Sequence, residues 1–329
     1  MIRRGFLLGK FMPIHEGHIL LCEVAAAQVD QLTVLLCSRD CEPINGQLRF
    51  EWARDSLHAK INVIHLHRDI PQEPSEHPDF WFIWRQTIQQ LHPEPIDWVF
   101  GSEPYILRLA QELDAKPFIF DQPRELMQIS ASLIRAQPQQ YWDYIPAAVR
   151  AYFQHRIVLL GAESTGKTQL CKTLAAHVQT RHIPEYGRNY DAVFKQDSAW
   201  RAEDFIHIAV GHAAIQHQIA RRSGYILFED TDFLQTLVWA EYLLGHIPPA
   251  LLSFAKQWQP ATHYLLLTSE VEWHDDGSRY SADADVRQWF FDRLQRWLVH
   301  FECSYQIITG SDWQQRTQQA IQQVKTRLT

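Results

Sequence analysis

Strand-like and helix-like segments alternate along this chain in two separate series, and this alternation restricts the fold more than any other feature. In the first series, short apolar runs such as GFLLGK (5–10) and LTVLLC (32–37) are each followed by a helix-like segment. A second series begins at RIVLLG (156–161) and ends with a helix at 312–328. Strands and helices that alternate in this way predict a parallel sheet with helices on both faces. The sequence therefore predicts an α/β protein with two doubly wound parallel-sheet domains.

The boundary between the two series is predicted within residues 138–156, where aromatic side chains favour a packed connector over a flexible linker. We expect one domain at 1–150 and another at 151–329. The expected strands are 5–10, 32–37, 62–67, 97–101, 117–120, 156–161, 225–230, 263–268 and 305–309. The expected helices are 18–28, 47–59, 79–91, 104–113, 130–137, 166–179, 202–223, 233–244, 285–302 and 312–328.

The composition is that of a soluble globular protein, because 46% of the 329 residues are hydrophobic and 21% are charged. No apolar run is long enough to span a bilayer, and the first ten residues lack the apolar core of a signal peptide. The net charge of −7 argues against broad binding to nucleic acid or to acidic lipid. The five cysteines show no pattern of a disulfide framework, so we expect reduced thiols in a cytoplasmic protein.

The segment GAESTGKT (161–168) matches the phosphate-binding pattern G-x-x-x-x-G-K-[ST] and stands between an apolar strand and a helix. Gly161 and Gly166 allow the backbone to curl, so that its N–H groups point at phosphate oxygens. Lys167 is expected to reach the β- and γ-phosphates, and the Thr168 hydroxyl is expected to ligate Mg²⁺. The remaining loop residues expected in this ATP site are Glu163, Ser164 and Thr165.

Acidic residues follow the next apolar strand, in YILFEDTDF (225–233). An acid at this place can hold Mg²⁺, and we assign that role to Asp230. Asp232 can instead cap the helix that begins at Phe233. The absence of a guanine-specifying N-K-x-D segment and of a long basic tract favours a small-molecule kinase over a GTPase or a nucleic-acid motor.

Two further segments are candidates for the acceptor side of this site. PEYGRNY (184–190) lies beyond the first helix, where small-molecule kinases place acceptor contacts; the alternative is an ordinary polar loop. The segment 272–285 suits a lid that closes over the phosphates. In a lid, Arg279 would stabilise charge on the transferred phosphoryl group. The alternative is that Arg279 is an ordinary solvent-exposed arginine of a loop. The candidates in 184–190 are Glu185, Tyr186, Arg188 and Tyr190.

The segment GKFMPIHEGH (9–18) places two histidines between a strand and a helix. A zinc site would need a third ligand, and no other residue is marked at the spacing of metal ligands. A phosphate site is the alternative, and it gains support from ISASLIR (129–135). There Ser130 can cap a short helix whose free N–H groups face an anion, and Arg135 can reach the same anion.

These two segments together predict a set of donors around one polyphosphate: Lys10, His15, His18, Ser130 and Arg135. Attack on an α-phosphate builds charge on the equatorial oxygens and on the departing pyrophosphate, and fixed donors stabilise both. The nucleophile can be the phosphate of a mononucleotide held in line, so no covalent enzyme intermediate is required.

The pattern G-[KR]-F-x-P-x-H-x-G-H with a distal I-S-x-x-x-I-R resembles the H-x-G-H nucleotidyltransferase superfamily. Within it the chain resembles NadR-type proteins, which join a Rossmann-like nicotinamide-mononucleotide adenylyltransferase domain to a P-loop ribosylnicotinamide kinase domain. The similarity rests on an ordered set of motifs that covers nearly the whole chain: GKFMPIHEGHI, ISASLIR, YWDYIP, GAESTGKT, EYGRNY, EDTDF and DGSR.

The resemblance implies that His15 and His18 contact ATP phosphates, with Ser130 and Arg135 completing that site. It also implies nucleotide-binding roles for the other residues of the first motif, Gly9, Lys10 and Phe11. In the kinase domain it implies Walker-type roles for Lys167, Thr168 and Asp230. Some family members carry an N-terminal helix-turn-helix that represses transcription. Because this chain starts a few residues before its first strand, we expect no such module and no nucleic-acid partner.

Aromatic side chains are candidates for holding the nicotinamide ring, because the ring is a flat cation. Trp81 and Trp84 lie near the end of the third expected strand, and core packing is the alternative for each. Tyr186, Tyr190 and Trp273 are the corresponding candidates in the kinase domain. Glu185 and Asp232 are candidates for contacting the ribose or for accepting the 5′-hydroxyl proton.

The predicted protein is a bifunctional enzyme that phosphorylates nicotinamide riboside and adenylylates the resulting mononucleotide to NAD. Both steps are expected to use ATP and Mg²⁺. One alternative is a bifunctional coenzyme A synthase, and another is a nucleotide-sensing regulator with little turnover. Small-molecule substrates are expected and a membrane partner is not; a homo-oligomer is compatible with the sequence.

Overall fold

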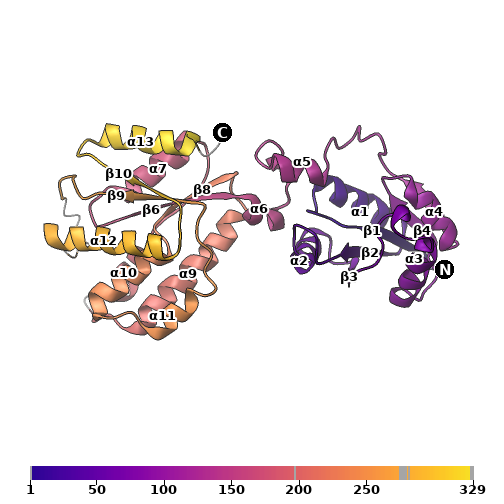
Figure 1. The fold of residues 1–329 in the computed structure, drawn as a ribbon, viewed down its shortest axis with the longest axis horizontal. Helices are drawn as coiled ribbons and strands as arrows, with labels where there is room; N and C mark the ends of the chain where they lie inside the picture. Colours follow the sequence, from indigo (N-terminus) through magenta and orange to yellow (C-terminus); the bar gives the residue numbers. More distant parts are fainter. Residues whose placement is uncertain (1, 196–197, 274–279, 281, 327–329) are drawn as a thin grey trace. The chain divides into compact units, whose positions relative to one another are not determined.

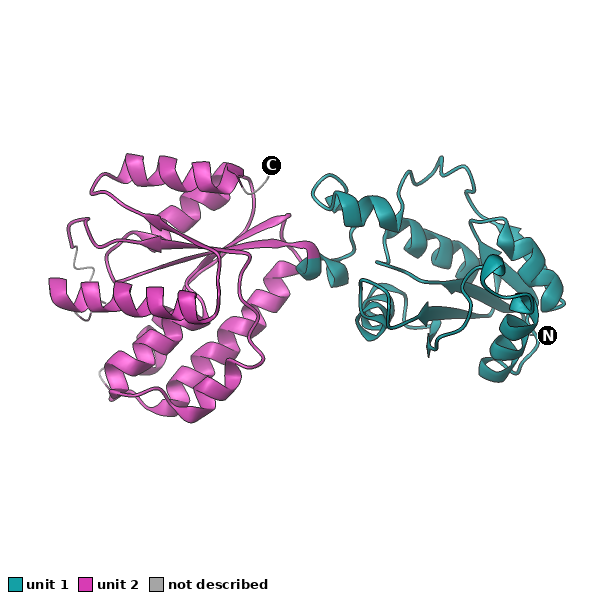
Figure 2. Cartoon of the chain, in the orientation of Figure 1, with its two compact units in different colours: residues 1–152 teal, residues 153–329 magenta. Residues whose placement is uncertain are grey.

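The computed structural model describes residues 2–195, 198–273, 280 and 282–326. The chain divides into two compact units, residues 1–152 and residues 153–329 (Figure 2). Each unit contains a five-stranded parallel sheet with helices packed on it (Figure 1). The predicted α/β class and the two parallel sheets are therefore confirmed. None of the helices in the described ranges is long and apolar enough to cross a membrane.

The sheet of the first unit has the strand order β3-β2-β1-β4-β5. Its strands are β1 (Arg4–Gly9), β2 (Gln31–Ser38), β3 (Asn62–His67), β4 (Trp98–Gly101) and β5 (Lys116–Ile119). Its helices are α1 (Glu16–Gln28), α2 (Gly46–Ser56), α3 (Phe80–Leu91), α4 (Tyr105–Glu112) and α5 (Ala131–Ala136). The strand order reverses between β1 and β4. In open parallel sheets, ligands bind beyond the carboxyl ends of the strands at such a point.

The core of the first unit forms where apolar strand residues meet helices α3 and α4. In β2, every residue from Leu32 to Ser38 is buried, as expected for a central parallel strand covered on both faces. Phe6 and Leu35 pack in one cluster with Trp84 and Leu109 from these helices. This packing fixes the carboxyl ends of the central strands.

The sheet of the second unit has the order β10-β9-β6-β8-β7, with β6 at its centre. Its strands are β6 (His155–Gly161), β7 (His182–Ile183), β8 (Ile226–Asp230), β9 (His263–Leu267) and β10 (Tyr305–Ile308). One face carries α7 (Lys167–His177) and α13 (Trp313–Thr326), and the other carries α9 (Ala202–Ala220), α10 (Phe233–Leu244) and α12 (Ala284–His300) (Figure 1). A separate apolar cluster lies on each face, so both faces of this sheet are covered.

Each expected strand and helix is present, with shifts of a few residues at its ends. The structure adds short elements that the sequence pattern did not predict: strand β7 and helices α6 (Ala147–Phe153), α8 (Tyr186–Tyr190) and α11 (Pro249–Phe254). A short π-helix, Asp191–Lys195, continues from α8. β7 has only two residues and exists because His182 and Ile183 pair with β8. Elements this short depend on tertiary contacts rather than on local propensity.

Candidate functional site

The P-loop of the second unit joins the end of β6 to the start of α7. Gly166 has a φ of +85°, a conformation that side chains other than glycine rarely adopt. A Cβ on Gly161 would lie 2.9 Å from the carbonyl oxygen of Leu267. Lys167 Nζ donates hydrogen bonds to the carbonyl oxygens of Gly161 (3.0 Å) and Ala162 (2.9 Å). The amine is thus held within the curve of the loop, where a phosphate chain would lie.

Asp230 and Thr168 meet at the end of strand β8. The Thr168 hydroxyl donates to Asp230 Oδ2 at 2.5 Å, and Asp230 is only 1% exposed. Its other carboxylate oxygen, Oδ1, is buried and has no hydrogen-bond partner among the described residues. A buried carboxylate oxygen without a donor, beside a hydroxyl oxygen, fits a hard cation such as Mg²⁺.

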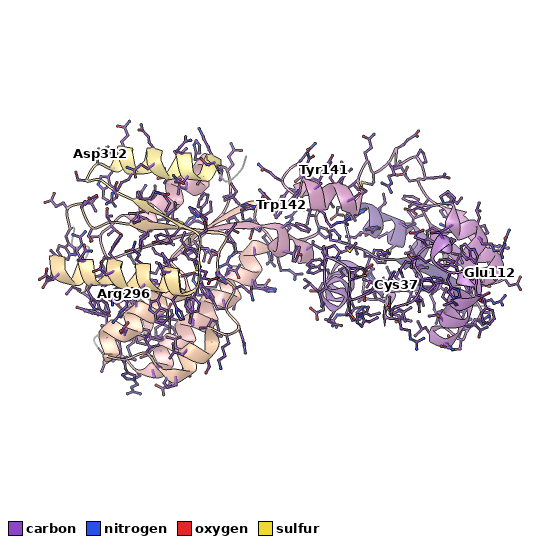
Figure 3. All side chains as sticks on the ribbon, in the orientation of Figure 1. Cys37, Glu112, Tyr141, Trp142, Arg296 and Asp312 are labelled. Carbon is purple, nitrogen blue, oxygen red and sulfur yellow. The ribbon has the colours of Figure 1, made fainter. Side chains whose placement is uncertain are left out.

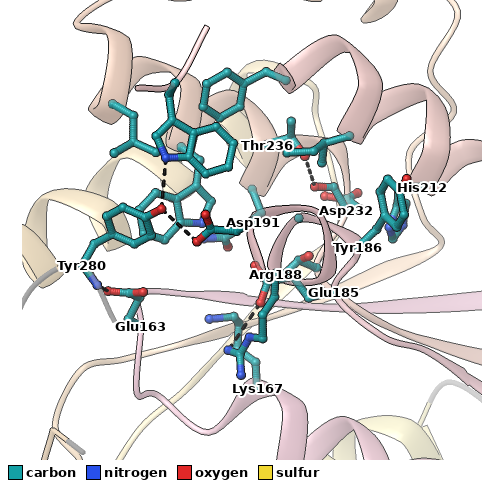
Figure 4. A pocket seen from close by; sticks show the side chains of 18 residues that line it. Glu163, Lys167, Glu185, Tyr186, Arg188, Asp191, His212, Asp232, Thr236 and Tyr280 are labelled. Carbon is teal, nitrogen blue, oxygen red and sulfur yellow. Dashed lines mark hydrogen bonds and ion pairs between the residues drawn. The ribbon is translucent and has the colours of Figure 1, made fainter. Parts of the chain in front are cut away.

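A pocket of about 70 Å³ opens beside the P-loop (Figure 4). Its aromatic wall is formed by Trp200, Trp239 and Tyr280. Tyr280 makes three hydrogen bonds here. Its backbone N–H donates to Glu163 (2.8 Å). Its hydroxyl donates to Asp191 (2.8 Å) and accepts from Trp200 Nε1 (3.0 Å). The carboxylates that line the pocket are Glu163, Glu185, Asp191 and Asp232. Aromatic faces together with carboxylates suit a flat cationic ligand.

Asp232 caps helix α10 and also lines this pocket. Its Oδ1 accepts from Leu234 N–H (2.9 Å), and its Oδ2 accepts from the Tyr264 hydroxyl (2.9 Å). Burial, with the nearby charge of Glu229, raises the pKa of Asp232 to about 6. The capping role considered from the sequence is therefore present, and the same carboxylate faces the pocket.

Within segment 184–190, residues 186–190 form helix α8, and Glu185 stands at its N-cap position. Glu185, Tyr186 and Arg188 line the pocket, and Glu185 lies 3.6 Å from the Arg188 guanidinium. Figure 4 shows the Glu185–Arg188 pair in the same pocket as Lys167, and Asp232 beside Thr236, whose hydroxyl donates to the Asp232 carbonyl oxygen. Tyr190 is absent from the described residues that line the pocket, and its hydroxyl donates to Asp204 (2.9 Å). Arg279 falls outside the described residues.

The first unit contains a larger cleft of about 700 Å³ at the carboxyl ends of β1 and β4. Every candidate residue that the sequence analysis assigned to this unit lines it: Gly9, Lys10, Phe11, His15, His18, Trp81, Trp84, Ser130 and Arg135. Segments more than one hundred residues apart thus meet at one site. Trp84 is only 3% exposed, and its Nε1 donates to the Pro71 carbonyl oxygen (2.8 Å). Trp84 therefore belongs to the core as well as to the cleft wall.

The two histidines of the first motif stack face to face, with ring centroids 3.7 Å apart. The Nδ1 atoms of His15 and His18 are both buried and have no hydrogen-bond partner in the described part of the chain. Burial, assisted by Arg124, lowers the pKa of His15 to about 4 and holds the pKa of His18 well below its usual range. Both rings are therefore neutral near pH 7, and each can present a nitrogen to an anion.

Helix α5 closes one side of this cleft. Ser130 caps it by accepting from Leu133 N–H (3.3 Å), and Ser130 and Ser132 share a hydrogen bond of 2.9 Å. The Arg135 guanidinium donates to the carbonyl oxygen of Met12, so α5 is tied to the histidine segment. Within the described ranges, no three His, Cys, Asp or Glu side chains are placed to hold one metal ion.

Two arginines were not predicted from the sequence: Arg124, which lines this cleft, and Arg49, which contacts the backbone of the cleft residue Lys10. Arg49 is 0% exposed and donates to the Lys10 carbonyl oxygen (2.6 Å). Arg49 also forms an ion pair with Glu42, and the Glu42 carboxylate lies 3.6 Å from Lys10 Nζ. Arg124 lines the cleft, and its charge lowers the pKa values of His15 and His18. Neither arginine belongs to a spaced motif, so the sequence offered no signal for them.

Each unit matches a known protein family. Residues 6–137 match the family described as Cytidylyltransferase-like, and residues 156–316 match the AAA domain family. The trifunctional NAD biosynthesis/regulator protein NadR of Salmonella typhimurium is 28% identical, with 98% of this chain and 82% of that protein covered. The nicotinamide-nucleotide adenylyltransferase of Methanolobus tindarius is 29% identical over 45% of this chain and 86% of that protein.

Two solved structures are similar to this chain along its whole length. A NadR protein in complex with NR has a TM-score of 0.82 at 22% identity, covering 99% of this chain and 96% of that chain. A NadR protein in complex with NAD and AMP-PNP has a TM-score of 0.78 at 22% identity, covering 100% and 96%. The structural match confirms the predicted fold, and the sequence match confirms the resemblance to NadR-type proteins.

Proposed function

We propose that this chain, a homologue of the NadR proteins, makes NAD from nicotinamide riboside in two steps, one in each unit. The second unit transfers the γ-phosphoryl group of ATP to the riboside 5′-hydroxyl. The first unit joins the resulting mononucleotide to the AMP part of a second ATP and releases pyrophosphate. The observation that carries this proposal is that each unit has its own pocket, lined by one of the two sequence motifs, in a chain similar to NadR along 98% of its length.

In the kinase unit, the loop N–H groups and Lys167 hold the β- and γ-phosphates. Thr168 and Asp230 would hold Mg²⁺, which neutralises phosphate charge when it is bound. We assign proton acceptance from the 5′-hydroxyl to Glu185, which lines the same pocket as Lys167. Asp232, whose carboxylate already accepts from Leu234 N–H and the Tyr264 hydroxyl, is assigned to the ribose hydroxyls.

In the adenylyltransferase unit, the phosphate of the mononucleotide attacks the α-phosphorus of ATP. The bond between the α-phosphorus and the bridging oxygen to the β-phosphate breaks, and the electron pair leaves on pyrophosphate. His15, His18 and Arg135 donate to the oxygens on which charge builds, and α5 turns its first N–H groups toward the same anion. Arg124 adds a cation at the same cleft. No side chain forms a bond to the substrate, because holding both reactants in line is sufficient.

The chemistry of the kinase pocket favours nicotinamide riboside as the acceptor. Trp200, Trp239 and Tyr280 form an aromatic wall, and Asp191 hydrogen-bonds to Tyr280 within it. A positively charged nicotinamide ring gains from both features. In a coenzyme A synthase, phosphopantetheine would enter the transferase cleft instead; it is flexible and uncharged at its far end, so the tryptophans of that cleft would have no cation to hold. Trp81 and Trp84 are assigned to the ring in the transferase cleft.

Mass-spectrometric product analysis tests this function. The purified chain is incubated with excess Mg-ATP and either nicotinamide riboside or phosphopantetheine. We expect nicotinamide mononucleotide, NAD and pyrophosphate from the riboside and no adenylylated product from phosphopantetheine. Dephospho-coenzyme A or coenzyme A as the product would instead identify a coenzyme A synthase. Binding of NAD without any turnover would support the regulator alternative.

We place this activity in the cytoplasm. All five cysteines are free thiols, and a reducing compartment keeps thiols in this state. Cys22, Cys37 and Cys171 are buried. Fractionation of cells that produce the chain would test this assignment.

A further inference from the structure

A fully buried arginine of helix α13 donates a hydrogen bond to the backbone of the P-loop. Arg316 is 1% exposed, and its Nη1 donates to the carbonyl oxygen of Thr165 at 3.1 Å. Its Nη2 donates to the carbonyl oxygen (2.8 Å) and the hydroxyl (2.9 Å) of Thr268, and its Nε donates to the Gly310 carbonyl oxygen (2.5 Å). One guanidinium thus joins the P-loop to the ends of strands β9 and β10.

The carbonyl of Thr165 needs such a donor because of how a P-loop works. The loop turns its N–H groups toward the phosphates, and its carbonyl groups need other donors. Lys167 supplies one to Gly161 and Ala162, and the Thr165 carbonyl accepts from Arg316. A buried carbonyl without a donor loses the hydrogen bond that water gave it in the unfolded chain, which destabilises the folded loop. Arg316 meets this need with a charged donor, which gives a stronger hydrogen bond than a neutral group. Burying a guanidinium is itself costly, and satisfying its N–H groups offsets that cost.

A second side chain of α13 covers the next residue of the loop. A Cβ on Gly166 would lie 1.9 Å from the ring of Trp313, so the ring rests directly on that glycine. Trp313 and Arg316 are three residues apart and lie on the same helix face. Asp312, labelled in Figure 3 at the start of α13, fixes this first turn by accepting from Gln315 N–H at 2.6 Å. The first turn of α13 therefore contacts residues 165 and 166 together.

We propose that Arg316 is a positioning residue for phosphoryl transfer, which holds the P-loop in its phosphate-binding shape through the Thr165 carbonyl. The proposal rests on the proposed kinase activity of the second unit. Arg316 acts through Thr165 and the adjoining Gly166–Lys167 backbone, and it does not contact the substrate. Loss of Arg316 frees the Thr165 peptide to rotate, which misdirects the N–H groups that follow it.

The test compares Arg316→Met and Arg316→Lys with Gln319→Ala. Gln319 is the matched control, because it ties the same helix to Thr309 through two hydrogen bonds of 3.2 Å without contacting the P-loop. For each variant, kcat and the KM values for ATP and riboside are measured in the phosphorylation reaction. Circular dichroism and thermal unfolding report whether the second unit of each variant is folded, and adenylyl transfer by the first unit serves as an internal reference. Titration with AMP-PNP measures nucleotide affinity without chemistry.

We expect kcat/KM for ATP to fall at least about tenfold in Arg316→Met, which corresponds to about 1.4 kcal/mol. The KM for riboside and the rate of adenylyl transfer should stay within about twofold, because neither depends on the P-loop. Arg316→Lys keeps the charge but cannot reach all four acceptors, so it should also lose at least about threefold. Gln319→Ala should stay close to the wild type.

Two results would overturn the proposal. One is a folded Arg316→Met variant with wild-type kcat/KM for ATP, and the other is an equal loss in Gln319→Ala, which would indicate general docking of α13. If Arg316→Met does not fold, Arg316→Lys tests the proposal instead: a folded Lys variant with wild-type kcat/KM for ATP, or an equal loss in Gln319→Ala, would overturn it. If the wild type does not phosphorylate riboside, the proposed function fails, and AMP-PNP affinity of the variants still decides the role of Arg316.

Discussion

At the scale of single residues, the cleft of the first unit depends on two stacked, neutral histidines. Burial keeps the pKa of His15 at about 4, so the ring carries no charge near pH 7. A bound polyphosphate would favour the protonated form, because an adjacent negative charge raises the pKa of an imidazole. His15 and His18 both line the cleft, and their Nδ1 atoms are buried without a hydrogen-bond partner among the described residues.

His18→Ala is predicted to lower the rate of adenylyl transfer by about 100-fold or more, because the loss of one fixed donor to transition-state charge has this effect. Riboside phosphorylation by the same protein should remain at the wild-type rate. Both rates can be followed in one assay by separating mononucleotide, NAD and pyrophosphate. Retention of wild-type adenylyl transfer would contradict the phosphate-binding role.

His15 is predicted to make the first unit acid-sensitive. Its pKa is lowered from 6.5 to about 4 in the folded protein, so the unfolded chain takes up a proton first as the pH falls. The free energy of unfolding should therefore decrease from pH 6.5 and lose about 3 kcal/mol by pH 4 through this residue. Urea unfolding of the wild type and of His15→Gln at pH 7 and pH 4.5 measures this contribution of His15 to the free energy of unfolding. An equal pH dependence in both proteins would show that His15 does not titrate in this way.

At the scale of elements, each site forms where a central strand ends and a helix begins. In the first unit this is the passage from β1 to α1, and in the second it is the passage from β6 to α7. Parallel strands bring their carboxyl ends to one edge, so loops that are distant in sequence converge there. Helix termini at this edge add N–H groups and the positive end of the helix dipole. The second unit adds α13, whose first turn supports the P-loop from outside.

Gly166→Ala is predicted to abolish riboside phosphorylation. Alanine is strained at a φ of +85°, and its Cβ would overlap the Trp313 ring, so the loop or α13 must move. Gly245→Ala is the matched control, because Gly245 has a φ of +73° with nothing within 4 Å of the added carbon.

The control should lose about 1–2 kcal/mol of stability from backbone strain alone and should keep its phosphorylation rate. Thermal unfolding and the rate of mononucleotide formation separate the two effects. Equal activity in Gly166→Ala and the wild type would indicate that the P-loop tolerates displacement.

At the scale of the whole molecule, each compact unit has its own core and its own pocket. The cleft of the first unit is lined by residues between Leu7 and Arg135, and the pocket of the second is lined by residues between Glu163 and Tyr280. No described residue of one unit lines the site of the other. The two chemical steps should therefore be separable by mutation.

Lys167→Ala is predicted to remove riboside phosphorylation, because the loop then lacks its cation for the β- and γ-phosphates. Adenylyl transfer to added nicotinamide mononucleotide should stay within about twofold of the wild type, since distant sites act independently. Mononucleotide and NAD formation are measured separately in the same preparation. Equal loss of both activities in a folded variant would refute the independence of the two units.

The sequence by itself determined the α/β class, the P-loop and the histidine motif. These features are local: strand and helix periods are read within about ten residues, and a phosphate loop needs glycines and a lysine at fixed spacing. Even for a distant pair such as His15 and Arg135, the two motifs were enough to predict one shared site, and the structure brings them to one cleft.

Only the tertiary structure decided which isolated side chains complete the sites. Arg49, Arg124 and Arg316 stand in no motif, and their roles depend on carbonyl groups or rings that lie far away along the chain. Strand β7 and helix α8 likewise form against β8 and α9, not from their own propensity. Local patterns carry no information about such long-range partners, because hydrogen bonds and burial depend on distances in space that only the folded chain fixes.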